Sequence, residues 1–117
     1  METFLAGYIG CMVWLTLDAN GEPDTDATWE KIAPSAMATI TAECAAFERE
    51  HKATWQAGGW TDGQAGHDFY LTRNGHGAGF WDRSFTEDNA AGQVLTAACK
   101  AMGEQELYRG DDGLYYV

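Results

Sequence analysis

Apolar side chains near the start of the chain recur in doublets spaced four residues apart. The doublets are Phe4 with Leu5, Tyr8 with Ile9, and Met12 with Val13. Positions with this spacing lie on one side of an α-helix, so the pattern predicts a helix that begins near Phe4. Gly7 and Gly10 each weaken that helix by about 1 kcal/mol relative to Ala, and residues 13–17 fit a short strand equally well.

The longest helical pattern follows a polar loop and starts at Pro34, a residue type well tolerated at the first position of a helix. Its apolar stripe recurs every three or four residues and consists of Met37, Ile40, Cys44, Phe47 and His51. Charged residues cover most of the opposite side, as in a helix with one buried face. We expect this helix to run from Pro34 to about Trp55.

Between residues 67 and 82 the periodicity changes from helical to alternating. Asn74-Gly75, near the centre of this stretch, is a strong signal for a two-residue turn. The pattern therefore predicts a β-hairpin. Its expected cross-strand pairs are Phe69 with Phe80, Leu71 with Ala78, Arg73 with His76, and His67 with Asp82.

A further helix is predicted to end at Gly103, with Ser84 or Thr86 as its N-cap and Glu87 and Asp88 in its first turn. Its expected buried stripe is Val94, Leu95, Ala98, Cys99 and Met102.

The end of the chain predicts a second hairpin, in which residues 104–109 pair with residues 114–117 across the turn at 110–113. The two hairpins together give an α+β fold, a four-stranded antiparallel sheet with two or three helices packed on one face. A chain of 117 residues has the length of one domain. We expect a single compact acidic domain that spans residues 1–117.

The chain is strongly acidic, with seven Lys and Arg against eighteen Asp and Glu and a net charge of −11. Binding to nucleic acid depends on clustered Lys and Arg, so direct binding to DNA or RNA, or to an anionic membrane, is disfavoured. The negative electrostatic field of the chain favours a basic protein as the partner. The apolar stretch 4–17 is too short to span a bilayer and follows Glu2 rather than a basic residue, which predicts a cytoplasmic location.

Three cysteines, Cys11, Cys44 and Cys99, lie far apart in the sequence and within apolar helical patterns. This placement predicts buried free thiols rather than a disulfide framework.

Exposed aromatic side chains on a sheet are typical of binding surfaces. One face of the predicted central hairpin carries Asp68, Tyr70, Thr72 and Trp81. With the acidic pair Asp111 and Asp112 of the last turn, these residues form the predicted binding surface. The alternative is that other elements cover the aromatic side chains, and the sequence favours neither.

The sequence offers two other chemical interpretations. The side chains His67, Asp68, His76 and Asp82 offer nitrogen and oxygen ligands for a metal, or an imidazole oriented by a carboxylate. Ordinary cross-strand polar pairs explain them better, and no cofactor is expected. The acidic loop that begins at Asp18 has Pro23 and Trp29 where a calcium-binding EF-hand requires Gly and Glu, so that motif is excluded.

The run from Gly66 to Arg83, GHDFYLTRNGHGAGFWDR, resembles a signature of small acidic proteins encoded by tailed bacteriophages and prophages. Weaker similarity extends over the opening FLxGYI, the KIAP segment at residues 31–34, and the closing YxGDDG. The resemblance implies a genetic context and carries over no catalytic residues.

These observations predict a non-enzymatic phage accessory protein in a bacterial host cell. The expected role is host-directed inhibition, of the anti-CRISPR, anti-restriction or DNA-mimic type, through binding of a basic nucleic-acid-binding protein. Two alternatives are a small metal-dependent or His/Asp-based enzyme centred on residues 67–82, and a phage structural or assembly component.

Overall fold

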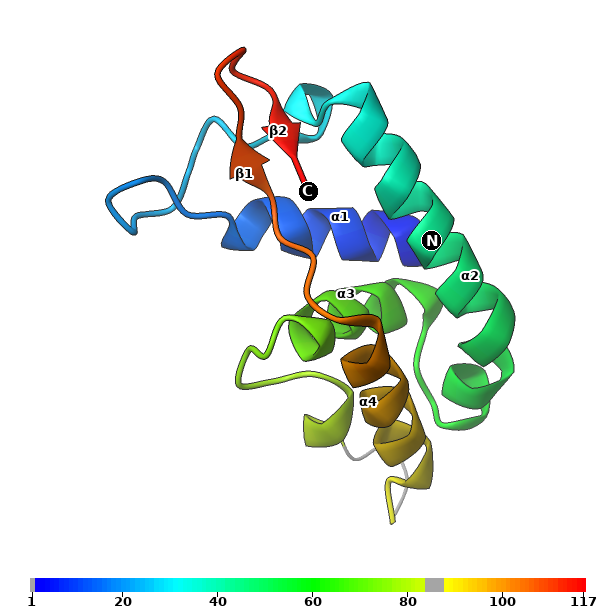
Figure 1. Cartoon of the computed structure of the whole chain (residues 1–117). Helices are drawn as coiled ribbons and strands as arrows, with labels where there is room; N and C mark the ends of the chain where they lie inside the picture. Colours follow the sequence, from blue (N-terminus) through cyan, green and yellow to red (C-terminus); the bar gives the residue numbers. More distant parts are fainter. Residues whose placement is uncertain (1, 84–87) are drawn as a thin grey trace.

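The computed structural model describes residues 2–83 and 88–117, and within them the fold is mostly helical (Figure 1). The α-helices are α1 (Phe4–Leu15), α2 (Pro34–Ala57), α3 (Asp62–Arg73) and α4 (Ala90–Met102). The fold also has two 3₁₀ turns, η1 (Trp29–Lys31) and η2 (Phe80–Asp82). Its two short strands are β1 (Tyr108–Arg109) and β2 (Tyr115–Tyr116).

The predicted four-stranded sheet is wrong. In the described part of the chain the one sheet has two antiparallel strands, with Tyr108 opposite Tyr116 and Arg109 opposite Tyr115. The C-terminal hairpin is thus confirmed, although its strands are shorter than expected. The central hairpin does not form, because residues 62–73 are helical and residues 80–82 are a 3₁₀ turn.

Local sequence signals explain why α3 is a helix. Thr61 accepts a hydrogen bond from the backbone N–H of Gln64, while the Gln64 side chain accepts one from the Thr61 N–H. This reciprocal pair is a capping box, which satisfies two backbone donors that a helix N-terminus otherwise leaves unpaired.

The Asn74-Gly75 pair, which indicated a hairpin turn, instead ends α3. Gly75 has a left-handed φ of 70°, its N–H donates to the carbonyl of Thr72, and the His76 N–H donates to the carbonyl of Leu71. These two bonds define a Schellman motif at the C-terminus of a helix. Asn-Gly tolerates positive φ, which a hairpin turn and the C-terminal end of a helix both require, so the dipeptide does not distinguish these two structures.

The remaining helix predictions are confirmed in most respects. α1 covers the first apolar doublets, and α2 begins at Pro34 as expected. α4 ends before Gly103 but begins only at Ala90, and its Val94 is exposed rather than buried. The predicted cap and first-turn residues Ser84, Thr86 and Glu87 lie outside the described residues.

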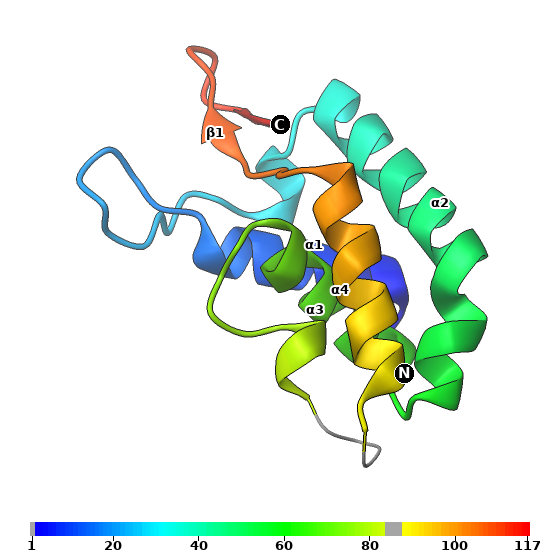
Figure 2. The same ribbon diagram turned by 60° about the horizontal axis from the view of Figure 1, so that its bottom comes forward.

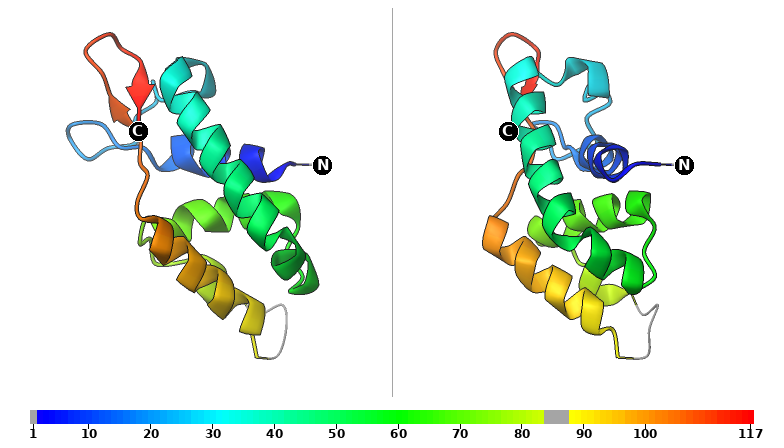
Figure 3. Two further views of the ribbon diagram at one scale, coloured as in Figure 1. Left: turned by 45° about the vertical axis from the view of Figure 1, so that its right-hand side comes forward. Right: turned by 90° about the vertical axis from the view of Figure 1, so that its right-hand side faces the viewer.

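Helices α1 and α3 cross with their backbones in direct contact, and the right-hand view of Figure 3 shows α3 directly below α1. A Cβ atom on Gly7 would lie 2.1 Å from the carbonyl oxygen of Gly63. One on Gly66 would lie 1.9 Å from the carbonyl oxygen of Phe4. Both distances are well inside van der Waals contact, so this approach requires glycine at both positions.

An aromatic cluster fills the core beside this crossing. Phe4 stacks on Trp55 with ring centroids 4.6 Å apart, and Phe47 stacks on Phe69 at 4.1 Å. Figure 2 shows how α2, which carries Phe47 and Trp55, runs alongside α4 while α4 lies over α3. All four rings are at most 2% exposed, so they bury much of the apolar area that stabilises the fold.

A buried polar network ties α1, α2 and α3 to the segment after α4. The Arg73 side chain donates to Glu43 at 2.8 Å, to the Tyr8 hydroxyl at 3.2 Å and to the carbonyl of Gly103 at 2.8 Å. The Tyr8 hydroxyl donates to Gln105 at 2.7 Å, and Gln105 donates to Glu43 at 2.9 Å. Because each polar group has partners, the network offsets the cost of burying the Arg73 charge.

Cys11, Cys44 and Cys99 are free and buried, as the sequence predicts. Burial raises the pKa of each thiol to about 12. Across residues 2–83 and 88–117, none of the helices combines the length and the apolar content needed to cross a membrane.

The glycine crossing gives a matched pair of stability predictions. Gly66→Ala places a methyl group against the Phe4 carbonyl and should lower the free energy of unfolding by about 1–3 kcal/mol. Gly10→Ala, on an exposed position of α1 where a Cβ meets no atom within 4 Å, should raise it by about 0.5–1 kcal/mol. Urea denaturation followed by circular dichroism measures both. Equal effects of the two substitutions would contradict the close crossing.

Candidate functional site

The loop between α1 and η1 is acidic and internally ordered. Residues 16–28 contain four carboxylates and no Lys or Arg. The Asp18 N–H donates to the carbonyl of Glu22, the Asp24 N–H donates to the carbonyl of Thr16, and Leu17 forms a backbone bridge with Pro23. Within the loop the Asp18 carboxylate accepts the backbone N–H of Glu22 at 3.0 Å. The loop therefore holds its carboxylates on a defined backbone.

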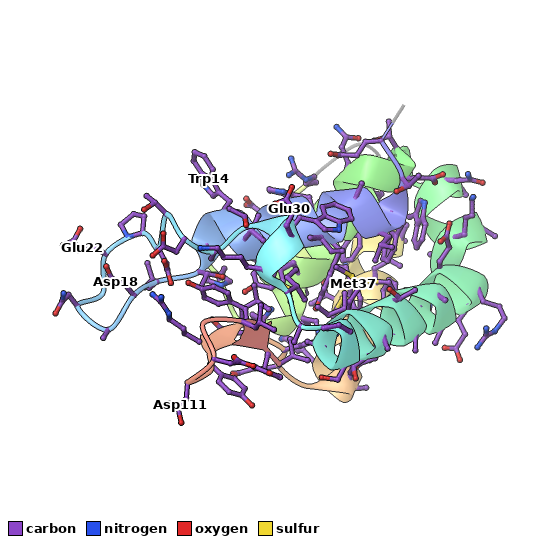
Figure 4. The ribbon with its side chains drawn as sticks, turned by 90° about the horizontal axis from the view of Figure 1, so that it is seen from above. Trp14, Asp18, Glu22, Glu30, Met37 and Asp111 are labelled. Carbon is purple, nitrogen blue, oxygen red and sulfur yellow. The ribbon has the colours of Figure 1, made fainter. Side chains whose placement is uncertain are left out.

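Side chains of the C-terminal hairpin fasten this loop to the rest of the molecule. The Tyr115 hydroxyl donates to Asp24 at 2.6 Å, and Arg109 forms an ion pair with Asp26 at 3.5 Å. Figure 4 shows Asp18, Glu22 and Asp111 at the same end of the molecule. We call this region the acidic end, and its six carboxylates are those of Asp18, Glu22, Asp24, Asp26, Asp111 and Asp112.

Hydrogen bonds keep two of these carboxyl groups ionised. The Tyr115 hydroxyl lowers the pKa of Asp24, and burial together with this contact raises the pKa of Tyr115 to about 12. The Tyr116 hydroxyl, which donates to Asp112 at 2.6 Å, lowers the pKa of Asp112. Both carboxylates therefore stay negative well below neutral pH.

An apolar hollow lies between α1 and the acidic loop. Its volume is about 520 Å³. The residues that line it include Gly10, Val13, Trp14, Leu17, Pro23 and Ala27. We call it the α1 groove. Trp14 is 80% exposed and Leu17 is 59% exposed, and Figure 4 shows Trp14 projecting from α1 near the acidic loop. Large apolar side chains that border a hollow are typical of a surface that binds a protein or ligand.

The predicted binding residues of the central segment do not share an exposed face. Tyr70 and Thr72 are buried on α3, and the Thr72 hydroxyl oxygen accepts a hydrogen bond from the Phe80 N–H. Trp81 is 51% exposed, but it lies on η2, which packs against α3 and α4. The strand face on which this prediction rested is not formed, because residues 62–73 are helical.

Asp68, another predicted binding residue, is fully buried. Its carboxylate accepts the Trp60 indole N–H at 2.8 Å and two hydrogen bonds from the Arg83 guanidinium, one of them at 2.9 Å. Asp68 thus joins α3 to the segment after η2. By contrast, Asp111 and Asp112 are exposed in the hairpin turn as the sequence suggests.

The four residues of the metal or His/Asp interpretation do not converge. His67 lies on α3, His76 stacks on Tyr70 in the loop after it, and Asp82 is exposed on η2. Among residues 2–83 and 88–117, no three His, Cys, Asp or Glu side chains are placed to hold a metal ion.

Sequence reasoning missed the α1 groove. Trp14 and Leu17 belong to an apolar run that is typical of a core segment, and α1 indeed carries no charged or amide side chain between Phe4 and Leu15. The sequence signal for the groove is that apolar residues occur on every side of α1. A helix that is apolar all round needs partners on every side, and α1 keeps one side open.

We predict that the Asp68–Arg83 pair is structural. Arg83→Met leaves the buried carboxylate without its guanidinium, and we expect the free energy of unfolding to fall by about 2–3 kcal/mol. This is below the value for fully buried pairs because Arg83 is 36% exposed. Arg49→Met, on the exposed side of α2, changes the net charge equally and should stay within about 0.5 kcal/mol of wild type. Equal losses in urea denaturation would refute the structural role.

Removing the Tyr115 hydroxyl should weaken the attachment of the acidic loop. Because Asp24 has a lowered pKa in the folded protein, its bond to Tyr115 contributes stability above the ordinary Asp pKa of about 4, and this is lost as pH falls further. Tyr115→Phe should therefore cost about 1 kcal/mol at pH 7 and progressively less below pH 4. Tyr108→Phe, at an exposed hydroxyl, is the control. Urea denaturation at pH 7 and pH 3 tests this, and a pH-independent loss would contradict it.

No protein-family model, curated protein or solved structure matches this chain.

Proposed function

We propose that this chain is a non-enzymatic binding protein that engages a basic protein through its acidic end. The observation that carries this proposal is the position of the four carboxylates of residues 16–28 beside the exposed Trp14 and the α1 groove. Such an arrangement combines long-range attraction of positive charge with an apolar contact surface.

The charge of the partner follows from the composition of the acidic end. Residues 16–28 contribute four negative charges and no positive charge. Arg109, which approaches them from the hairpin, is paired with Asp26. A nucleic acid or an anionic membrane would be repelled, whereas Lys and Arg side chains would be attracted.

The resemblance of residues 66–83 to phage proteins adds a biological setting to this proposal. In that setting the protein is a host-directed inhibitor, of the anti-CRISPR, anti-restriction or DNA-mimic type, that occupies the basic surface of a host nucleic-acid-binding protein. The alternative of a phage assembly component requires self-association, which light scattering measures. The metal alternative requires a group of ligand side chains that the described residues do not bring together. The His/Asp alternative was based on a hairpin that pairs His67 with Asp82, and that hairpin is not formed.

Affinity capture from bacterial lysate tests the proposed function. The immobilised protein should retain a basic nucleic-acid-binding protein at low salt and release it at high salt, because the attraction is screened over a Debye length of about 8 Å at physiological ionic strength. Asp18→Asn, Glu22→Gln and Asp26→Asn combined should weaken the capture about tenfold, since three exposed ion pairs contribute about 0.5 kcal/mol each.

The matched control removes three negative charges elsewhere on the molecule. Glu50→Gln, Asp82→Asn and Glu104→Gln change the net charge by the same amount at exposed positions on α2, on η2 and after α4. Capture by this control should stay close to wild type. Capture that resists both salt and neutralisation of the acidic loop would overturn the proposal, and an equal loss in both triple variants would show that the acidic end has no special role.

A further inference from the structure

The open side of α1 is an apolar surface that nothing in the described chain covers. α1 packs against α3 through its glycines and against α2 through Phe4. Gly10 and Trp14 lie on an exposed side of the helix, and Trp14 is the most exposed of the large hydrophobic side chains described. Single exposed apolar side chains are common on protein surfaces. Trp14 and Leu17, however, both border a hollow of about 520 Å³, and such a combination is typical of a binding surface.

The wall of the α1 groove opposite the helix is held in place before any partner arrives. The backbone bridge between Leu17 and Pro23 closes the acidic loop on itself. Asp24 lines the groove, its N–H donates to Thr16, and its carboxylate accepts the Tyr115 hydroxyl. A preformed groove does not have to be ordered when a ligand binds, which favours affinity.

The negative charge around the groove determines which kind of apolar segment can bind there. Asp24 lines it, and Asp18 and Glu22 lie in the same short loop with no Lys or Arg among residues 16–28. A second copy of this chain brings a net charge of −11 to the contact and is disfavoured. A segment that presents one bulky apolar side chain between Lys or Arg residues satisfies both the groove and the carboxylates.

We propose that the α1 groove binds a basic amphipathic segment of a protein, whose apolar side chain enters between Trp14 and Pro23 while its cations face the acidic loop. This inference rests on the proposed function for the basic character of the partner. It adds the groove as the place where the partner is anchored and Trp14 as the central contact. Trp is the residue type that most often dominates the energy of such contacts.

Three synthetic peptides of 14 residues test the inference. The first is a helix-forming Lys/Leu peptide with Leu on one face, the second replaces each Leu by Ser, and the third replaces each Lys by Glu. Titration into ¹⁵N-labelled protein is followed by NMR, with the Trp14 indole signal assigned from a Trp14→Phe variant. The Lys/Leu peptide should bind at least tenfold more tightly than either of the others and shift the signals of Trp14, Leu17 and Ala27.

Two variants and one control locate the site. Trp14→Ser removes the exposed ring, and Gly10→Leu partly fills the groove at a position where a Cβ meets no atom within 4 Å. Each should weaken Lys/Leu binding at least tenfold. Trp81→Ser removes a half-exposed ring on η2 and should leave binding unchanged. Circular dichroism checks that each variant is folded.

The remaining outcomes separate this inference from the proposed function. Equal binding of the Lys/Leu and Lys/Ser peptides would overturn the groove and leave the acidic end as the binding surface. Equal binding of the Glu/Leu peptide would overturn the selection for basic segments. Self-association that Trp14→Ser abolishes would make a second copy the occupant and overturn the proposal. Failure of all three peptides to bind at millimolar concentration would also overturn it, whereas salt-labile capture from lysate judges the proposed function independently.

Discussion

The backbone contact between α1 and α3 is the constraint on which the rest of the structure depends. Because Gly7 and Gly66 have no side chain, the two helices approach until the backbone of one touches the other. That approach places Phe4 and Tyr8 against Phe69, with ring centroids 5.6 and 5.0 Å away. From there the Tyr8 hydroxyl reaches the buried network of Arg73, which joins α2 and the segment after α4. The aromatic core and the polar network therefore both require the glycine crossing.

The same crossing determines which side of α1 is left exposed. With one side against α3 and α2, the Gly10 and Trp14 side faces outward and forms the α1 groove together with the acidic loop. The hairpin then holds that loop through Tyr115 and Arg109, which gathers carboxylates from two distant parts of the sequence at one end. Charge for long-range attraction and an apolar hollow for contact thus lie side by side, as protein interfaces combine them.

Helix periodicity and turn chemistry correctly predicted α1, α2, the end of α4 and the C-terminal hairpin, because the signals in those segments are compatible with one structure only. Asn74-Gly75 is compatible with two structures, since the same pair closes a hairpin or ends a helix through a Schellman motif. The capping box of Thr61 and Gln64 favours the helix, whereas the alternation after residue 67 favours the hairpin, and the structure follows the capping box. The burial of Asp68 and the exposure of Trp14 depend on tertiary contacts, which no local pattern specifies.

The central claim is that the partner contacts the acidic end beside Trp14 rather than the segment around Trp81. The photo-crosslinking residue p-benzoylphenylalanine, introduced in place of Trp14 or in place of Trp81, tests it directly in bacterial lysate at low salt. We expect a crosslink to a basic protein from position 14 that disappears at high salt, with none from position 81. A salt-independent crosslink from position 14, or a crosslink from position 81 alone, would contradict it.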